Sequence, residues 1–347
     1  MRILILSTDG IPVPPEHYGG IERIVADVAP ELTRRGHDVA MLAMAGSRLN
    51  GVQCSSWEQW PLVPNALGYG VQALLQARRF RADLIHSFGQ TKWLLPWCVA
   101  GGRAVISFGA LPQKRVRHML HPFRDQLLLV GCSNYLSSAG AAMVAGRWRT
   151  VYNCVDLQRY QFERSVAPDA PLVFLSRIDA IKGVHVAMEI AQRSDRRLIV
   201  AGNHMDAGDS GRYWREVVEP RLKDPRIEYI GPVNDEQKNR LLGQAAAMVV
   251  PIQWDEPFGV VFVEALACGT PVISCARGAL PEIVRDGVEG FLGKTADELV
   301  HAVARLAEID RQACRRRVEE YFSVERIVDN YEKLYQELLD YRQARVA

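Results

Sequence analysis

The sequence predicts an α/β protein with two parallel β-sheets, and three observations support this fold class. The first is a repeated order of short apolar run, Gly/Pro-rich loop and amphipathic segment. The second is that the apolar runs are nearly continuous and β-branched, which is typical of strands buried on both faces of a sheet. The third is that the order starts twice, at 2–7 and at 171–177, around an irregular polar segment at 159–171. We therefore expect two Rossmann-like domains facing each other across a cleft.

Each element follows from this pattern. A strand is expected at 2–7, a loop at 8–20, and a helix at 21–35 that Gly36 terminates. The other expected strands are 38–44, 82–88 and 103–109 in the first series and 171–177, 197–202, 227–231, 247–252 and 271–276 in the second. The final stretch has the periodicity of a long amphipathic helix. The expected organisation is a first domain at 1–160, a second at 161–325, and a C-terminal helix at 326–347 that packs back towards the first domain.

Composition narrows the class of protein. Of 347 residues, 48% are hydrophobic and 24% charged, which fits a globular chain with a large core. The net charge of +2 argues against wholesale nucleic-acid binding. The seven cysteines are scattered, without CxxC pairs or zinc spacing, which favours buried, reduced thiols. The chain enters its first strand without a signal region and holds no membrane-length apolar run, so we expect a cytoplasmic protein.

Two glutamates flank an apolar segment in the second series. The stretch "DEPFGVVFVEALACGTPV" (255–272) places Glu256 in a loop after a strand and Glu264 on the following helix, which Gly269 terminates. The amides of residues 258–261 would form a helix N-terminus suited to phosphate. At about 1.5 Å per helical residue the glutamates lie on the order of 10 Å apart, about the span from the hexose to the ribose of a nucleotide-sugar. Alternatively, Glu256 complements the helix dipole and Glu264 is paired internally.

Two other loops carry candidate ligand-binding residues. Arg177 and Lys182 bracket a strand-to-helix loop and could hold a diphosphate, although both could be solvated surface cations. Gly19 and Gly20 immediately precede the first helix, where backbone can approach a ligand closely. Glu22, in the first turn, is either a cap or a ligand. No GxGxxG or GxxxxGK[ST] pattern occurs, which argues against dehydrogenase and P-loop functions.

Four stretches, "YGGIERIV", "LSRIDAIKG", "EPFGVVFVEALACGTPVI" and "GALPEIVRDGVEGFL", together resemble the retaining glycosyltransferases of family four, which have the GT-B fold. The resemblance implies that Arg177 and Lys182 hold the donor diphosphate, that Glu256 binds the transferred sugar, and that Glu264 binds the ribose diol. It also implies a backbone cradle for the donor, for which the candidates are Gly19, Gly20, Phe258, Gly259, Val260 and Val261.

The chain departs from the family pattern in two places. Cys154 stands where glycine is usual, and His86 is followed by Ser87 and Phe88 rather than by a second histidine two positions on. Despite this departure, the resemblance makes His86 a candidate catalytic residue facing the reacting sugar, with a structural role as the alternative. Trp254 could stack on a sugar or pack between domains.

The resemblance implies a retaining, metal-independent transfer from a nucleoside-diphosphate sugar, with a UDP- or GDP-sugar as co-substrate and no other cofactor. The acceptor would be the hydroxyl of a saccharide, a lipid-linked molecule or a natural product, bound by the first domain. The basic, partly apolar stretches 74–81 and 113–124 could contact a membrane surface or an anionic acceptor, or could be solvated helix faces. The alternatives in function are a nucleotide-sugar epimerase and a non-catalytic nucleotide-binding partner.

Overall fold

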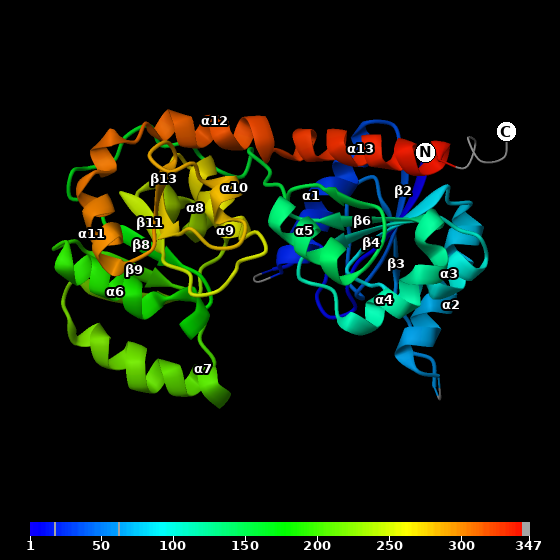
Figure 1. Ribbon diagram of the computed structural model, residues 1–347, viewed down its shortest axis with the longest axis horizontal. Helices are drawn as coiled ribbons and strands as arrows, with labels where there is room; N and C mark the ends of the chain where they lie inside the picture. Colours follow the sequence, from blue (N-terminus) through cyan, green and yellow to red (C-terminus); the bar gives the residue numbers. More distant parts are fainter. Residues whose placement is uncertain (17–18, 62, 342–347) are drawn as a thin grey trace. The chain divides into compact units, whose positions relative to one another are not determined.

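The chain folds into two compact units. The computed structural model describes residues 1–16, 19–61 and 63–341, without the side chain of Lys114. One unit comprises Met1–Cys154 with the segment that begins at Val324, and the other comprises Val155–Ser323 (Figure 1). Both are parallel-sheet α/β units, as the sequence predicted. They are called unit 1 and unit 2 below.

Unit 1 is built on a seven-stranded parallel sheet in the order β3-β2-β1-β4-β5-β6-β7. The strands are β1 (Arg2–Leu6), β2 (Asp38–Ala43), β3 (Gln53–Ser56), β4 (Leu84–Phe88), β5 (Ala104–Phe108), β6 (Leu127–Gly131) and β7 (Trp148–Thr150). Every residue of β4 and of β6 is buried. Because successive strand residues point to opposite faces, both faces of the sheet are covered.

Helices of unit 1 connect and cover these strands. They are α1 (Gly20–Arg34), α2 (Asn65–Phe80), α3 (Leu95–Val99), α4 (Lys114–Leu120), α5 (Asn134–Met143) and α13 (Val324–Asp340), with 3-10 turns η1 (Lys92–Leu94) and η2 (His121–Gln126). The chain leaves α1 through Gly36, whose φ of 87° suits the predicted glycine stop. The candidate pair Gly19–Gly20 therefore sits at the start of α1.

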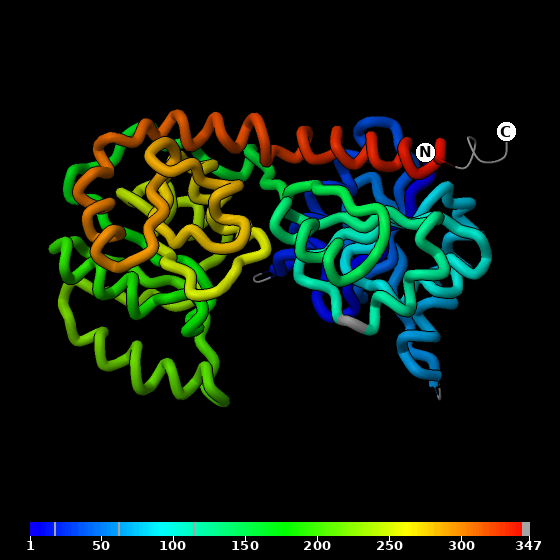
Figure 2. Tube along the Cα trace, viewed as in Figure 1, coloured from blue at the N-terminus to red at the C-terminus, as the bar shows by residue number. Residues whose placement is uncertain are grey.

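The C-terminal helix α13 packs against unit 1, which confirms the expected packing (Figure 2). It contacts α1 and β6, and its apolar side buries Tyr331, Tyr335 and Leu338. Arg35, just after α1, donates to Asp329 at 2.5 Å and to Glu332 at 2.7 Å. The last six residues of the expected helix, 342–347, lie outside the described residues.

Unit 2 is built on a six-stranded parallel sheet in the order β10-β9-β8-β11-β12-β13. Its strands are β8 (Leu172–Leu175), β9 (Leu198–Ala201), β10 (Ile227–Gly231), β11 (Ala247–Val250), β12 (Val272–Cys275) and β13 (Gly290–Gly293). Its helices are α6 (Val184–Arg193), α7 (Gly208–Tyr213), the π-helix η4 (Trp214–Val218), α8 (Asp235–Gly243), α9 (Val260–Ala267), α10 (Leu280–Ile283), α11 (Ala296–Ala304) and α12 (Arg311–Tyr321). The 3-10 turns are η3 (Ala180–Lys182), η5 (Glu219–Lys223) and η6 (Leu306–Glu308).

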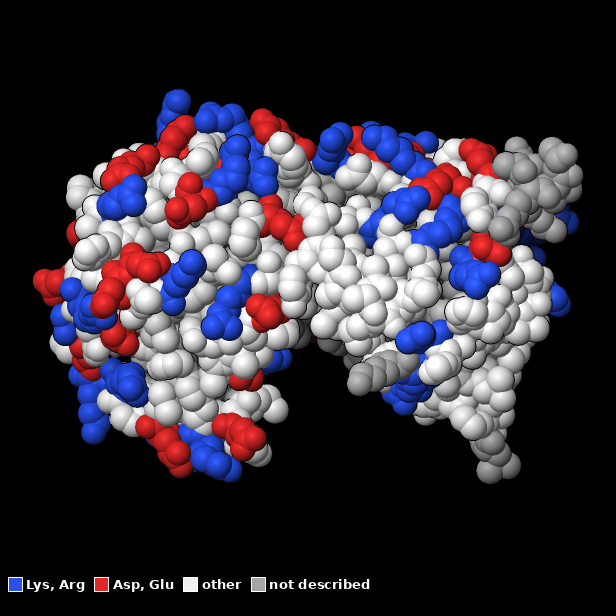
Figure 3. All heavy atoms as spheres, viewed as in Figure 1, with Lys and Arg blue, Asp and Glu red and all other residues white. Residues whose placement is uncertain are grey.

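Charges of both signs intermingle on the visible face of unit 2, whereas a broad area of the visible face of unit 1 carries neither (Figure 3). The intermingling agrees with the net charge of +2. Among the described residues, no helix combines the length and the apolar character that crossing a membrane requires.

Candidate functional site

Four candidate residues lie in unit 2, around the carboxyl ends of its strands. Arg177 follows β8, Lys182 ends η3, Glu256 lies in the loop between β11 and α9, and Glu264 lies in α9. Ligands of open parallel sheets bind at this edge, because strand-to-helix loops and helix N-termini gather there. The sequence placed these residues on the correct elements.

Lys182 and Glu256 form an ion pair in which the carboxylate is almost fully buried. Glu256 is 7% exposed, and its Oε2 accepts from Lys182 Nζ and, at 2.9 Å, from Trp254 Nε1. The ammonium of Lys182 also lies 5.0 Å from the centroid of the Trp254 ring. No described residue donates a hydrogen bond to Oε1 of Glu256. One oxygen thus anchors the side chain and the other stays open to a donor.

The backbone of Glu256 is held as firmly as its side chain. Its carbonyl accepts from the amide of Ala279 at 2.8 Å. Gly278 makes this approach possible, because a Cβ there would lie 2.3 Å from that same carbonyl oxygen, and its φ of 55° is left-handed. The amide of Gln253 donates to the carbonyl of Ile181 at 2.8 Å, which ties the Glu256 loop to η3. The loops that carry Lys182 and Glu256 therefore form one braced assembly.

The N-terminus of α9 lies between the two glutamates in sequence. Gly259 caps it with a φ of 85°, and a Cβ at this position would lie 2.6 Å from the ring of Phe262. Val260 and Val261 are half-buried, and amides of a first helical turn have no acceptor within the helix. Phe258 is 2% exposed and packs edge-on against Phe322, so it offers only its backbone to a ligand.

Glu264 has its own pair of donors. It is 5% exposed, and its Oε1 accepts from the hydroxyl of Tyr160 at 2.6 Å and from Nζ of Lys238 at 2.5 Å. Sequence reasoning missed both partners. A readable signal did exist for Lys238, because Asn234 and Gln237 have capping-box spacing, and the structure shows that box at the start of α8. It places Lys238 at the end of the first helical turn.

Arg177 is the one of these four residues whose side chain makes no hydrogen bond with the described residues. Its side chain is 39% exposed, and Nε has no hydrogen-bond partner among the described residues. The closest carboxylate oxygen is Oδ2 of Asp179, at 3.6 Å. That carboxylate also accepts from Ser210 Oγ at 3.1 Å. Nε is thus buried beside Asp179, whereas the two terminal nitrogens donate to no described residue and are available to an anion.

Gly19 and Gly20 belong to unit 1 and differ in their surroundings. A Cβ at Gly19 would lie 2.7 Å from Cβ of Pro15, so packing requires glycine there. A Cβ at Gly20 would meet nothing within 4 Å, so the first turn of α1 is open at this point. Glu22 is 4% exposed and accepts from Thr8 Oγ1, which makes it part of the structure of this loop.

His86 is fully buried in β4, and both ring nitrogens are engaged by unit 1 itself. Nδ1 lies 2.7 Å from the Tyr335 hydroxyl, and Nε2 lies 2.8 Å from Ser107 Oγ. The ring stacks on Phe88 with centroids 4.2 Å apart. Burial lowers the pKa of His86 to about 3, so the imidazole is neutral at physiological pH. This environment favours the structural alternative over contact with a sugar.

Comparison with known proteins assigns the family. Residues 161–321 match the family model described as glycosyl transferases group 1, and residues 18–159 match glycosyltransferase family 4. The two matches together span most of the chain.

The chain belongs to glycosyltransferase family four.

Individual relatives of this glycosyltransferase are distant. It is 21% identical to spore coat protein SA of Bacillus subtilis over 97% of this chain and 99% of that protein. It is 32% identical to a D-inositol 3-phosphate glycosyltransferase of a Mycobacterium species, but over only 43% of this chain and about a third (35%) of that enzyme. The crystal structure of Anabaena HepE in complex with UDP-glucose superimposes with a TM-score of 0.75 at 19% identity, covering 97% of this chain and 100% of that one. The structural likeness confirms the GT-B fold.

The basic stretch 113–124 forms α4 and η2 of the glycosyltransferase. Arg115, Arg117 and His118 are exposed, whereas Val116 and Leu120 are buried. The alternation is that of an amphipathic surface helix. Either sequence interpretation, a solvated face or a surface for an anionic group, fits this exposure.

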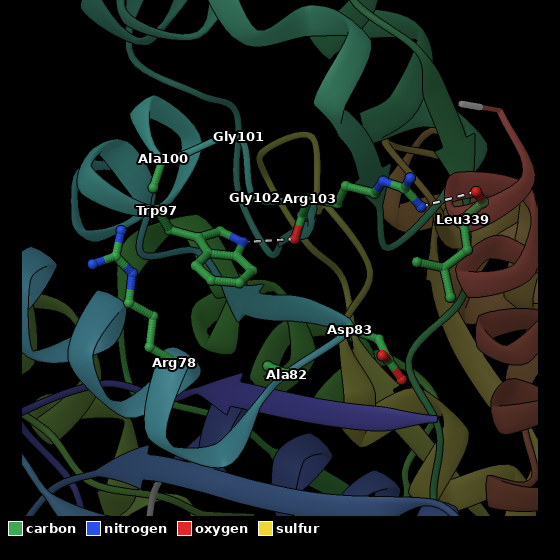
Figure 4. A pocket seen from close by; sticks show the side chains of 9 residues that line it. All are labelled: Arg78, Ala82, Asp83, Trp97, Ala100, Gly101, Gly102, Arg103 and Leu339. Atoms are coloured by element: carbon green, nitrogen blue, oxygen red, sulfur yellow. Dashed lines mark hydrogen bonds between the residues drawn. The ribbon is translucent and has the colours of Figure 1, made fainter. Parts of the chain in front are cut away.

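A surface hollow of about 390 Å³ lies in unit 1 at the amino-terminal ends of its strands (Figure 4). Its walls include Asp83 and Arg103, which immediately precede β4 and β5 and so mark the amino ends of these strands. Figure 4 shows that Arg103 is committed within the protein, since it donates to the carbonyl of Leu339 at 2.8 Å and accepts from Trp97 at 2.9 Å. Parallel sheets bind ligands at the carboxyl ends of their strands, so we do not assign substrate to this hollow.

The glycosyltransferase shows no cluster of three or more metal-ligating side chains within the described ranges. All seven of its cysteines are free thiols. Burial raises the pKa of Cys98, Cys268 and Cys314 to about 12, so these three are inert thiols at neutral pH.

Proposed function

We propose that this glycosyltransferase transfers a sugar from a nucleoside-diphosphate sugar to an acceptor hydroxyl, with retention at the anomeric carbon and without a metal ion. The observation that carries the proposal is the state of the two glutamates. Glu256 and Glu264 are both buried, and each uses one carboxylate oxygen to accept two protein donors while the other oxygen accepts none from the described residues. A sugar hydroxyl is the kind of donor that satisfies such an oxygen.

In this proposal the donor lies along α9. Glu256 accepts from hydroxyls of the transferred sugar, and Glu264 accepts from the ribose diol. The diphosphate between them meets the first-turn amides of Val260 and Val261, where the helix dipole favours negative charge. The UDP-glucose of Anabaena HepE agrees with a donor of this class.

Arg177 and Lys182 supply the positive charge that a leaving diphosphate needs. The terminal nitrogens of Arg177 make no hydrogen bond with a described residue, so they can donate to a phosphate oxygen. An ammonium has three donors, so Lys182 can hold Glu256 and still reach a phosphate oxygen. Charge aimed at the leaving group before reaction stabilises the transition state without reorganisation. We assign the leaving-group role to these two cations, in place of a metal.

Retention is proposed to proceed by attack on the face that the diphosphate leaves. The acceptor oxygen forms its bond to the anomeric carbon as the bond to the phosphate oxygen breaks, and that phosphate oxygen takes the acceptor's proton. A covalent double displacement needs a carboxylate at the anomeric carbon, with its acid partner about 5 Å away. Here the two buried glutamates are assigned to opposite ends of the donor, and His86 is assigned no proton transfer.

Calorimetric titration tests the donor site. The wild type is titrated with UDP, GDP, ADP and dTDP in the presence of EDTA, and the titrations are repeated on Arg177→Ala and on the control Arg212→Ala, which alters an exposed pair with Asp209. Micromolar binding of one nucleotide, weakened only by Arg177→Ala, supports the proposal. A folded protein that binds none of the four contradicts it.

Turnover tests the chemistry. The corresponding nucleotide-sugar is supplied with candidate acceptors, and the anomeric configuration of the product is read by NMR. Retained configuration in the presence of EDTA is the expected result. An inverted product contradicts the same-face mechanism, and release of a free sugar isomer without acceptor supports the epimerase alternative instead.

A further inference from the structure

The strongest unassigned feature is the pair of protein donors on Glu264. Tyr160 lies in the segment that enters unit 2, Lys238 lies in α8, and Glu264 lies in α9, so three separate parts of the unit converge on one carboxylate. Both donors reach Oε1, Tyr160 at 2.6 Å and Lys238 at 2.5 Å. Lys238 Nζ also lies 5.5 Å from the centroid of the Tyr160 ring, so the three groups form one cluster.

The cluster is rigidly supported. The carbonyl of Tyr160 accepts from Arg315 at 2.9 Å. The neighbouring amide of Gln161 donates to Asn239 at 3.0 Å, which ties this segment to α8 next to Lys238. The capping box of Asn234 and Gln237 determines where α8 begins and so sets the position of Lys238. Each donor is therefore held by contacts that do not involve Glu264.

This support leaves Glu264 with one usable oxygen. Rotation of the carboxylate would break two hydrogen bonds, one of them to an ammonium that offsets the buried charge. Oε2 accepts no hydrogen bond from any residue that the structure describes. A fixed oxygen with two lone pairs suits two adjacent hydroxyl groups.

We propose that Lys238 and Tyr160 are positioning residues: by holding Oε1 of Glu264 they fix Oε2 towards the ribose diol, so that these two side chains set how strongly the site rejects a 2′-deoxyribonucleotide. This inference rests on the proposed function and adds the two residues that position Glu264. A site built to accept from a hydroxyl rejects the analogue that lacks it, because the buried acceptor is then left unpaired.

The test compares matched nucleotides on matched proteins. Dissociation constants are measured by calorimetry for UDP, GDP and ADP, each against its 2′-deoxy counterpart. For the base that binds, the wild type is expected to prefer the ribonucleotide at least about tenfold. In Lys238→Met the ribonucleotide affinity falls while the 2′-deoxy affinity changes little, so the preference collapses. In Tyr160→Phe the preference is reduced, and in Lys238→Arg it is largely restored.

Arg240→Met is the control, because Arg240 lies on the same helix and makes an exposed pair with Glu236. It is expected to keep the wild-type preference. Thermal unfolding of every variant establishes that it folds. If Lys238→Met does not fold, the test rests on Tyr160→Phe.

A wild type that binds ribo- and 2′-deoxynucleotides equally overturns ribose selection and leaves the donor site standing. The cluster has only a structural role if Lys238→Met loses affinity equally for the ribonucleotide and the 2′-deoxynucleotide and Tyr160→Phe keeps the wild-type preference for the ribonucleotide. Absence of binding by every nucleotide defeats the proposed function itself.

Discussion

Lys182 and Glu256 form an ion pair inside unit 2 in which the lysine side chain is 15% exposed and the glutamate side chain 10%. The pair joins η3 to the loop before α9, and Trp254 donates to the same carboxylate oxygen. Removing Lys182 leaves a nearly buried carboxylate with Trp254 as its single neutral donor, which is far more costly than the pair itself. The contact thus couples the stability of unit 2 to the geometry of its candidate site.

The first prediction concerns this coupling. Lys182→Met is expected to lower the free energy of unfolding by about 3 kcal/mol, because Glu256 stays buried without its counter-ion. Urea denaturation followed by circular dichroism measures the change. Arg240→Met, at an exposed pair, should cost under about 0.5 kcal/mol. If the two substitutions cost the same, the Lys182–Glu256 pair is not a stabilising contact in solution.

Arg177→Ala is expected to lower kcat by about 100-fold, since the guanidinium is assigned to charge that grows on the leaving diphosphate. Its melting temperature should match the wild type, because the side chain makes no hydrogen bond and its ion pair with Asp179 is long, at 3.6 Å, and partly exposed. Steady-state kinetics and a thermal melt are the two measurements. Unchanged kcat in Arg177→Ala would remove the residue from the mechanism.

Gly259→Ala tests the start of α9. The substitution places a Cβ 2.6 Å from the Phe262 ring at a φ of 85°, so it should cost roughly 2–4 kcal/mol and weaken nucleotide binding by displacing the first-turn amides. Gly287→Ala is the matched control, because its φ of 75° is similar and a Cβ there meets nothing within 4 Å. That change should cost only about 1 kcal/mol. Denaturation and calorimetry distinguish the outcomes, and equal costs would argue against the clash with Phe262.

His86 predicts a pH dependence of stability. Its pKa is lowered to about 3 in the folded chain, whereas an unfolded chain has the ordinary value of about 6.5. Below pH 6.5 the unfolded state therefore binds a proton that the folded state does not, and stability is lost as pH falls from 6.5 towards 3. The difference in unfolding free energy between wild type and His86→Gln should change by about 1.4 kcal/mol per pH unit below pH 6. Urea titrations at pH 7, 6 and 5 measure it, and parallel curves would show that His86 titrates normally.

The strands of the core could largely be predicted from the sequence because buried parallel strands are continuous apolar runs. Segments 2–7, 82–88 and 247–252 each contain an observed strand. Three strands were missed for a physical reason. β3 and β7 hold half-buried or exposed residues without an apolar run, and β13 is a four-residue strand with glycine at both ends. β6 was also missed, although its run of leucines is readable.

The site was predictable where its geometry is local. Glu256 and Gly259 lie three residues apart, so a strand-to-helix turn is enough to relate them. The contact between Lys238 and Glu264 joins two helices, and it depends on how α8 and α9 pack. His86 shows the same limit. Its partners Tyr331 and Tyr335 lie some 250 residues downstream, and no local pattern connects them to β4.

The position of α13 has a consequence for biosynthesis. Tyr331, Tyr335 and Leu338, which complete the interior of unit 1, are translated only after the whole of unit 2. His86 and Ser107 likewise lack the hydroxyl groups of Tyr335 and Tyr331 until those residues have been translated. While the ribosome makes the 169 residues of Val155–Ser323, the half-finished first unit exposes the apolar side that α13 later covers. Unit 2 is formed by one continuous segment, so its interior can be completed before that of unit 1.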